Sequence, residues 1–295
     1  MQRLITTLFL VLLLNGCGPQ SATPAEESPA LGTDVLTLAI HPYDSPSLLV
    51  ARFQPLVSYL EKALQRPLEL RVSSTYEEQI RDIVAGRIDI AYMGPTPYIR
   101  AHDRYQAGEA QRIQLVAAEV ACLSSIVVRR DSGIERVADL RGRTFAFGAH
   151  ISFGSHYIPR MMLLREGIEL ADLRDYNFIE RHERIAQAVL HGDYDAGGMR
   201  RRVAREFIAN NPELHILATS PDLPPYALVA RAGLDPLLIE QIRNAMIAPD
   251  DEGRLAIAEI GGNVRYRMIE DSDYDFARRV TDRLERVDGA SEAIW

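Results

Sequence analysis

Side chains that can act as nucleophiles, bases or hydrogen-bond donors gather in the middle of the sequence. Ser152, Ser155 and His156 stand close together, and His182 and Asp195 follow them. These are the residue types of a serine hydrolase triad, but the second glycine of a Gly-x-Ser-x-Gly turn is missing around Ser155. Serine, histidine and aspartate are common, so their presence without defined geometry does not indicate catalysis. We therefore expect no enzymatic activity and no catalytic residue.

Histidine is also a metal ligand, and several histidines lie in the same part of the chain. No pair of them has the i, i+4 helical spacing with an intervening glutamate that marks a zinc protease, and no His-rich loop is present. We expect no metal site and no cofactor. The histidines considered are His150, His156, His182 and His191.

A hydroxyl-rich turn at the start of a helix suits a third kind of chemistry, the binding of an anion. Backbone N–H groups at a helix N-terminus are free to bind an oxyanion, and the helix dipole favours negative charge there. The formal net charge of -8 argues against a nucleic acid partner, because that partner needs a basic protein face. An enclosed site of backbone amides still admits a small anion.

The segments that must position these residues alternate between short apolar runs and helical patterns. Ser45 followed by Pro46 predicts a helix start, and Thr75 with Glu78 forms a capping box. The alternation predicts an α/β fold with mostly parallel strands. Strands are expected at Val35–Ile40, Leu68–Val72, Ile88–Met93, Ile126–Arg129 and Thr144–Phe147, and helices at 45–64, 75–84, 153–165 and 185–190, with another opening at Gly94.

One local pattern occurs twice: a helix end, a glycine, two residues, an aspartate and a buried strand. Gly86 and Asp89 belong to the first copy, and Gly192 and Asp195 to the second. Two such units fit a bilobal protein with its ligand between the lobes. We expect residues 34–123 plus 221–295 to form the first lobe, with the C-terminal helices on it, and residues 124–220 to form the second. Two chain crossings would then make a hinge.

The N-terminus has the features of a targeting segment. Arg3 precedes an apolar run from Leu4 to Leu14 that is too short to span a bilayer. The run ends in a Leu14–Cys17 box that resembles a bacterial lipoprotein cleavage site. We expect a signal peptide over residues 1–17, lipidation of Cys17 and a flexible tether over 18–33, which gives a periplasmic, membrane-anchored protein. The alternative is an ordinary secretory signal with an incidental cysteine.

A lipidated Cys17 leaves Cys122 as the second cysteine of the sequence, without a disulfide partner in the mature chain. Cys122 lies in the apolar stretch Val120–Val128. We expect it to be a buried strand residue and not a nucleophile.

Four stretches of the sequence carry a family resemblance through their order and spacing. They are Ser45–Leu60, Tyr76–Pro95, Asp139–Pro159 and His182–Gly197. Together they resemble the phosphate/phosphite/phosphonate-type substrate-binding proteins of ABC transporters, over roughly residues 35–250. The resemblance implies a two-lobed type II periplasmic-binding-protein fold in a monomer. It also implies capture of a small phosphonate- or phosphate-like oxyanion by lobe closure, for delivery to an ABC permease.

The same resemblance implies the residues of the binding site. Where phosphonate-type relatives carry further hydroxyls, this chain has Phe153 and Gly154, so the specific ligand stays open. Arg200 stands where a contact to the tail of the ligand is expected, which would favour an acidic tail. The positions that match the family site are Tyr76, Gly94, Pro95, Thr96, Ser152, Phe153, Gly154, Ser155, His156 and His182.

Each of the side-chain assignments has a structural alternative. Tyr76 could be an exposed first-turn residue, and Thr96 could cap its helix as well as bind. Ser152 and Ser155 could act only as helix caps. His156 could point outward, and His182 could hold a loop at a solvated helix start. At the level of function, the alternative is an extracytoplasmic sensor of the ligand for a membrane kinase or cyclase.

Overall fold

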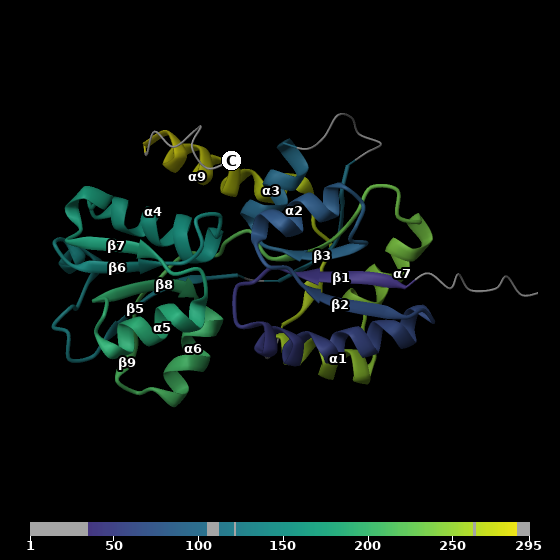
Figure 1. The fold of residues 1–295 in the computed structure, drawn as a ribbon, viewed down its shortest axis with the longest axis horizontal. Helices are drawn as coiled ribbons and strands as arrows, with labels where there is room; N and C mark the ends of the chain where they lie inside the picture. Colours follow the sequence, from purple (N-terminus) through teal and green to yellow (C-terminus); the bar gives the residue numbers. More distant parts are fainter. Residues whose placement is uncertain (1–34, 105–111, 121, 262–263, 288–295) are drawn as a thin grey trace, which may run out of the picture. The chain divides into compact units, whose positions relative to one another are not determined.

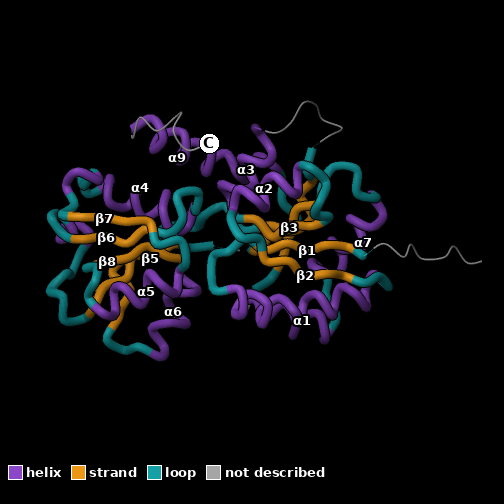
Figure 2. Tube along the Cα trace, in the orientation of Figure 1, coloured by secondary structure: helices purple, strands orange, loops and turns teal. Residues whose placement is uncertain are grey.

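The computed structural model describes residues 35–104, 112–120, 122–261 and 264–287, and Figures 1 and 2 show their fold. The predicted signal peptide over 1–17, the lipidation site Cys17 and the tether over 18–33 lie outside the described residues. Those three assignments therefore stay predictions. No helix within the described ranges is long and apolar enough to cross a membrane.

The described strands form two sheets, and we call the part of the chain built on each sheet a lobe (Figure 2). The first sheet has the order β11-β4-β10-β3-β1-β2 and the second the order β7-β6-β8-β5-β9. The strands of the first sheet are β1 (Leu36–Ile40), β2 (Leu68–Val72), β3 (Ile90–Met93), β4 (Gln114–Glu119), β10 (Ala227–Ala230) and β11 (Tyr266–Arg267). Those of the second are β5 (Ser124–Arg129), β6 (Thr144–Phe147), β7 (Asp175–Phe178), β8 (Ala196–Arg200) and β9 (Leu214–Thr219).

Both sheets are mixed, so the expectation of mostly parallel strands is wrong. β1 runs parallel to β2 and β3, and β6 runs parallel to β7 and β8. The antiparallel strands β5 and β10 each follow a passage of the chain from one sheet to the other, at 120–123 and at 220–226. Such a strand does not follow a β-α-β crossover, so nothing requires it to be parallel to its neighbours.

Helices flank both sheets (Figure 1). In the first lobe they are α1 (Pro46–Leu64), α2 (Tyr76–Val84), α3 (Pro95–Arg104), α7 (Pro236–Ile247) and α8 (Asp251–Gly261). In the second they are α4 (Ile158–Arg165), α5 (His182–His191) and α6 (Arg201–Asn210), with the π-helical turn η3 (Phe153–Tyr157) directly before α4. Short turns complete the set: η2 (Val137–Leu140), η4 (Leu170–Asp172) and η5 (Asp271–Tyr274).

The last helix, α9 (Asp275–Val287), contacts both lobes: α3 in the first, and η3 and α4 in the second. The expectation that the C-terminal helices pack on the first lobe therefore holds for α7 and α8, which contact α1, and is incomplete for α9, which packs on α3 and on the second lobe as well. Arg100 of α3 donates to the Tyr157 hydroxyl at 3.1 Å and to Glu285 of α9 at 2.9 Å. The C-terminal helix thus ties the lobes together on one side.

Residues close to the helix and strand ends, such as N-cap residues, explain several of the observed boundaries. Thr75 caps α2, because its Oγ1 accepts from the backbone N–H of Glu78 at 3.0 Å. Ser45 stands at the N-cap of α1 but makes no side-chain bond there. Each sheet buries apolar residues against its helices. The core of the first lobe includes Leu38, Phe53 and Leu56, and the two faces of the second sheet bury Phe145, Phe147 and Leu163 on one side and Val127, Ile185 and Val189 on the other.

The two copies of the helix–Gly–x–x–Asp–strand pattern have the same structural role in the two lobes. Asp89 Oδ2 accepts from the backbone N–H of Thr37, in β1, at 3.0 Å. Asp195 Oδ2 accepts from the backbone N–H of Thr144, in β6, at 2.9 Å. Each aspartate therefore fixes the start of the neighbouring parallel strand, and the glycine before it ends a helix with a positive φ, 72° at Gly86 and 82° at Gly192.

Candidate functional site

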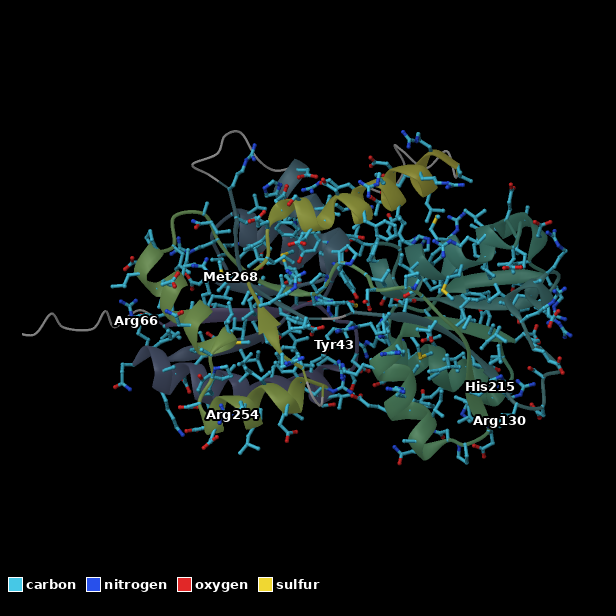
Figure 3. All side chains as sticks on the ribbon, turned by 180° about the vertical axis from the view of Figure 1, so that it is seen from behind. Tyr43, Arg66, Arg130, His215, Arg254 and Met268 are labelled. Carbon is cyan, nitrogen blue, oxygen red and sulfur yellow. The ribbon has the colours of Figure 1, made fainter. Side chains whose placement is uncertain are left out.

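Loops of the two lobes contact each other directly at the ends of β1, β3 and β8. The backbone N–H of His182, at the start of α5, donates to the carbonyl of Tyr43, just after β1, at 3.1 Å. Arg200, at the end of β8, donates to the hydroxyl of Tyr92 in β3 at 3.1 Å. Figure 3 shows Tyr43 between the two sheets. We define the interlobe cluster as His41, Tyr43, Tyr76, Thr96, Ser152, His182 and Arg200.

Several polar atoms of the interlobe cluster are buried and have no hydrogen-bond partner among the described residues. Each residue concerned is at most 4% exposed. An unpaired buried polar group costs about 1–3 kcal/mol, so a fold rarely keeps several together unless something else pairs them. A polar ligand held between the lobes would supply the missing partners. The atoms are the hydroxyls of Tyr43, Tyr76 and Thr96, both ring nitrogens of His182, and Nε2 of His41.

Tyr76, in the first turn of α2, lies inside the cluster and is not an exposed first-turn residue. It is 4% exposed, and its ring centroid lies 4.7 Å from that of His41. Burial raises the pKa of Tyr76 well above its usual value, against a smaller lowering by the Ser152 hydroxyl of the second lobe. Tyr76 therefore stays a neutral hydrogen-bond donor, next to a hydroxyl from the opposite lobe.

The turn between β3 and α3 brings Thr96 into the cluster. Thr96 is 1% exposed and its Oγ1 has no partner, so this hydroxyl does not cap the helix. Pro95 begins α3, where a missing N–H is harmless. A Cβ on Gly94 would lie 3.1 Å from the Tyr226 ring, so the glycine lets that ring approach. Gly94 and Pro95 shape the turn, and Thr96 presents the free hydroxyl.

The two serines of the turn at 152–156 have different roles. Ser152 Oγ accepts from the Ser155 backbone N–H at 3.3 Å and from Ser155 Oγ at 2.7 Å. Ser155 has thereby used its only hydroxyl hydrogen, and it faces Gly148, where a Cβ would lie 1.9 Å from Ser155 Oγ. Ser152 is a helix cap, and its own hydroxyl hydrogen stays free to be donated. Ser155 fixes the position of the Ser152 hydroxyl through these two hydrogen bonds.

The remaining residues of that turn have their side chains in protein cores. The Phe153 ring is 2% exposed and meets Phe276 of α9 edge-on. The His156 ring donates from Nδ1 to the carbonyl of His150 and packs edge-on against Phe178. Burial lowers the pKa of His156 to about 3, so the ring is neutral. Phe153 and Gly154 can serve a ligand through backbone N–H groups at the start of the helical run 153–165.

His182 is fully buried, so the expectation of a solvated helix start is wrong at this residue. Its ring centroid lies 5.9 Å from that of Tyr43, and both ring nitrogens lack partners. Burial, and then the positive charges of Arg200 and Arg202, hold the pKa of His182 well below its usual value. The neutral ring offers one donor and one acceptor.

Arg200 is already paired within the protein. Its Nη2 donates to Glu119 Oε2 at 2.6 Å, and its guanidinium carbon lies 3.8 Å from the centroid of the Tyr226 ring. The Arg200 and Glu119 side chains are 4% and 3% exposed. Tyr92 also donates to Glu119, so the carboxylate neutralises the arginine and accepts from both neighbours. Because its charge is paired with Glu119, the guanidinium forms a wall of the cluster, and the predicted contact to an acidic ligand tail stays a prediction.

Sequence reasoning missed four members of this arrangement: His41, Tyr43, Tyr92 and Glu119. Tyr92 and Glu119 lie in β3 and β4, whose sequences read as apolar core. His41 and Tyr43 follow β1 immediately. Ligands of open α/β sheets bind beyond the carboxyl ends of strands, so two polar aromatic residues directly after the first strand were a usable signal.

Two surface cavities are also present. One of about 830 Å³ is lined by residues such as Met246, Arg254 and Ile257. The other, of about 540 Å³, runs along Arg201 and Arg205 and reaches the Arg200–Glu119 pair from outside the cluster. Neither is lined by His41, Tyr76, Ser152 or His182. The unpaired buried atoms indicate the interlobe cluster as the candidate ligand site, because a ligand would pair them, whereas solvent can fill an open cavity.

Two further chemistries find no support in the described part of the chain. Residues 35–104, 112–120, 122–261 and 264–287 contain no group of three or more histidine, cysteine, aspartate or glutamate side chains placed to hold a metal ion. Cys122 is buried, as expected, but it lies between β4 and β5 and forms a single antiparallel bridge with Leu223, so the expectation of a strand residue is wrong. Burial raises the pKa of Cys122 to about 11, so its thiol is not a nucleophile at neutral pH.

Comparison with known proteins yields a family match over most of the chain. The family described as "ABC transporter, phosphonate, periplasmic substrate-binding protein" matches residues 38–274. The phosphate-import protein PhnD of Mycolicibacterium smegmatis is 27% identical over 202 residues, which are 64% of this chain. That match spans 61% of the length of the curated relative.

Solved structures share the fold at low sequence identity. PhnD1 from Prochlorococcus marinus, in complex with methylphosphonate, has a TM-score of 0.77 and 17% identity over 86% of this chain and 99% of that chain. A binding protein component of an ABC phosphonate transporter from Pseudomonas aeruginosa has a TM-score of 0.75 and 18% identity over 89% and 90%. They confirm the predicted fold class, an α/β, two-lobed, type II periplasmic-binding-protein fold.

Proposed function

The chain belongs to the family of periplasmic phosphonate-binding proteins of ABC transporters, and from this membership we propose that it captures a small phosphorus oxyanion between its two lobes. Phosphonate and phosphate are the candidate ligands. Among the relatives, one is named for phosphate import and one was solved with methylphosphonate.

The observation that carries this proposal is the set of unpaired buried polar groups contributed by both lobes. Tyr76 and Thr96 come from the first lobe, and His182 from the second, with Ser152 keeping one free hydroxyl hydrogen. A ligand that bonds to both sets gains its full interaction energy only when the lobes are together. Its binding would therefore favour the closed form.

Donors dominate this set, and that is the reason to propose an anion. Tyr76, Thr96 and Ser152 offer hydroxyls, and the Phe153 and Gly154 N–H groups add the start of a helical run. The seven residues of the interlobe cluster include no carboxylate that could attract a cation, and the neighbouring Glu119 is paired with Arg200. We propose Ser155, His156 and the Phe153 ring as the support of this turn, and Gly94 and Pro95 as the support of Thr96.

For cellular context, we propose a periplasmic monomer anchored through a lipidated Cys17 and delivering its ligand to an ABC permease. The Leu14–Cys17 box supports the anchor, and family membership supports the permease. The two passages of the chain, at 120–123 and 220–226, support a hinge between a first lobe of residues 34–123 plus 221–295 and a second lobe of 124–220.

A ligand titration tests the proposal. Thermal melts of the purified protein with methylphosphonate, phosphite and phosphate should show a rise in melting temperature that grows with ligand concentration, because the ligand binds the folded state. Equal concentrations of chloride serve as the control for ionic strength. Absence of any shift up to millimolar concentration of all three compounds would contradict the proposed function.

A further inference from the structure

We propose that His41 accepts a hydrogen bond from the acidic hydrogen of the bound oxyanion. The site would then select singly protonated phosphorus oxyanions over sulfur oxyanions of the same shape. This inference rests on the proposed function and narrows its ligand class.

The hydrogen bond to Tyr92 fixes the tautomer of His41. Nδ1 of His41 lies 2.9 Å from the backbone carbonyl oxygen of Tyr92, which can only accept, so Nδ1 carries the hydrogen. Burial, which outweighs this hydrogen bond, lowers the pKa of His41 to about 3, with a smaller contribution from Arg200. The ring is therefore neutral, and Nε2 carries no hydrogen. Nε2 can only accept.

This acceptor is unpaired and faces the donors of the interlobe cluster. His41 is 0% exposed and its Nε2 has no partner. The centroid of its ring lies 4.7 Å from that of Tyr76 and 5.2 Å from that of Tyr43, whose hydroxyls are also unpaired. The rings of Tyr226 and Tyr92 stack against it at 5.5 and 5.9 Å. A ligand that accepts hydrogen bonds from the tyrosine hydroxyls therefore also lies next to His41 Nε2, which needs a hydrogen-bond donor.

The groups around His41 keep one protonation state near neutral pH. Burial raises the pKa of Tyr76, Tyr92 and Tyr226, and it lowers that of His182. Arg200 stays charged beside Glu119. The oxyanion bound beside these groups can therefore change its own proton count in this range while they keep theirs.

One more carboxyl titrates near neutral pH, at the contact between the lobes. Burial and a hydrogen bond with Glu183 of α5 raise the pKa of Asp44 to about 7, against the charge of Arg52. Protonation of Asp44 acts on the contact between the lobes whatever the ligand is. A sulfur oxyanion measured on the same protein therefore reports the effect of Asp44 alone.

Phosphorus oxyanions and sulfur oxyanions of the same shape differ in whether the anion carries an acidic hydrogen. Phosphate-type anions lose their second proton near pH 6, so phosphorus oxyanions keep an acidic hydrogen in weakly acidic solution. A sulfonate or sulfate has none under these conditions, and one of its oxygen lone pairs would face the lone pair of Nε2. Loss of a hydrogen bond to a charged ligand, with an acceptor left unpaired, corresponds to roughly 10- to 100-fold in affinity.

Isothermal titration of the purified protein at pH 6 with methylphosphonate and methanesulfonate, and with phosphate and sulfate, tests the inference. We expect the wild type to prefer the phosphorus compound of at least one pair by about 10-fold or more. His41→Phe should bring this ratio below about 3-fold, and His41→Gln, which keeps an acceptor, should preserve part of it. The carbonyl of Tyr92 stays paired in these variants, because Gln79 Nε2 also donates to it at 3.2 Å.

The control is His215→Phe, the same substitution on β9 in the second lobe, far from Tyr43 in Figure 3. It should leave the ratio unchanged. Between pH 6 and 9, wild-type affinity for methylphosphonate should fall more steeply than affinity for methanesulfonate, and His41→Phe should remove the difference.

The outcomes separate the two proposals. Equal wild-type affinity for the phosphorus and sulfur compounds overturns the inference and needs no variant. A ratio that survives in folded His41→Phe also overturns it, and in that case the proposed function stands. No binding of any of the four compounds overturns the proposed function and this inference with it.

Discussion

Removal of the Tyr76 hydroxyl separates ligand binding from folding more cleanly than any other single change in the site. The Tyr76 hydroxyl has no close hydrogen-bond partner among the described residues, and the neighbouring Ser152 hydroxyl keeps its bonds from Ser155, so Tyr76→Phe leaves no described protein group unpaired. The free energy of unfolding should stay within about 0.5 kcal/mol of the wild type. A hydrogen bond to a charged ligand contributes about 1.5–3 kcal/mol, which corresponds to a loss of affinity of roughly 10- to 150-fold.

Tyr59→Phe is the matched control. The Tyr59 hydroxyl, in α1, donates to the backbone carbonyl of Ala245 at 3.0 Å, so its removal leaves a carbonyl unpaired. This variant should lose about 1–3 kcal/mol of stability and bind ligand with wild-type affinity. Isothermal titration with methylphosphonate and thermal melts give both quantities for each variant. A Tyr76→Phe protein that binds within about 3-fold of the wild type would refute the assignment of this hydroxyl.

Three other changes test separate parts of the structure. Ser152→Ala should weaken both binding and folding, whereas Ser155→Ala should mainly lower the melting temperature; an equal loss of affinity in both would show that Ser155 also contacts the ligand. The pKa of Asp44 is raised from 3.8 to about 7, so the native protein holds a proton that the unfolded chain loses above about pH 4. Native stability therefore falls as pH rises from about 4 to 7, and Asp44→Asn should flatten that slope in melts recorded across this range. Cys17→Ser should release the protein from membranes in cell fractionation, and continued palmitate labelling of the variant would contradict the anchor.

The sequence predicted those parts of the fold that depend on neighbouring residues. The strands Leu68–Val72 and Thr144–Phe147 have the expected bounds, and Thr75 caps α2 as expected. The direction of β5 and β10 could not be predicted in this way, because it depends on where the chain enters each sheet. The position of α9 depends on contacts with both lobes, which no local pattern encodes.

For the candidate site, the sequence indicates segments of the chain more than individual atoms. Four residues of the predicted segments are buried where the two lobes meet: Tyr76, Thr96, Ser152 and His182. The sequence motifs around them indicated these segments. The direction of the Ser155 hydroxyl toward Gly148 follows from three-dimensional packing and has no trace in the sequence.

The pairing of Arg200 shows the same limit for charges. Glu119 precedes it by a long stretch of chain and lies in the other lobe, so only the fold brings the carboxylate within 2.6 Å of the guanidinium. Both side chains belong to strands whose other residues are mostly apolar. The sequence alone therefore gives no sign that Arg200 is paired.

The most direct test of the central claim is a crystal structure of the protein with methylphosphonate. We expect the phosphonate group between the lobes, with oxygens within about 2.6–3.2 Å of the Tyr76, Thr96 and Ser152 hydroxyls. We also expect one phosphonate oxygen within the same distance of His41 Nε2. Methylphosphonate bound instead in the cavity along Arg201 and Arg205, with the interlobe hydroxyls still unpaired, would contradict the proposed binding site.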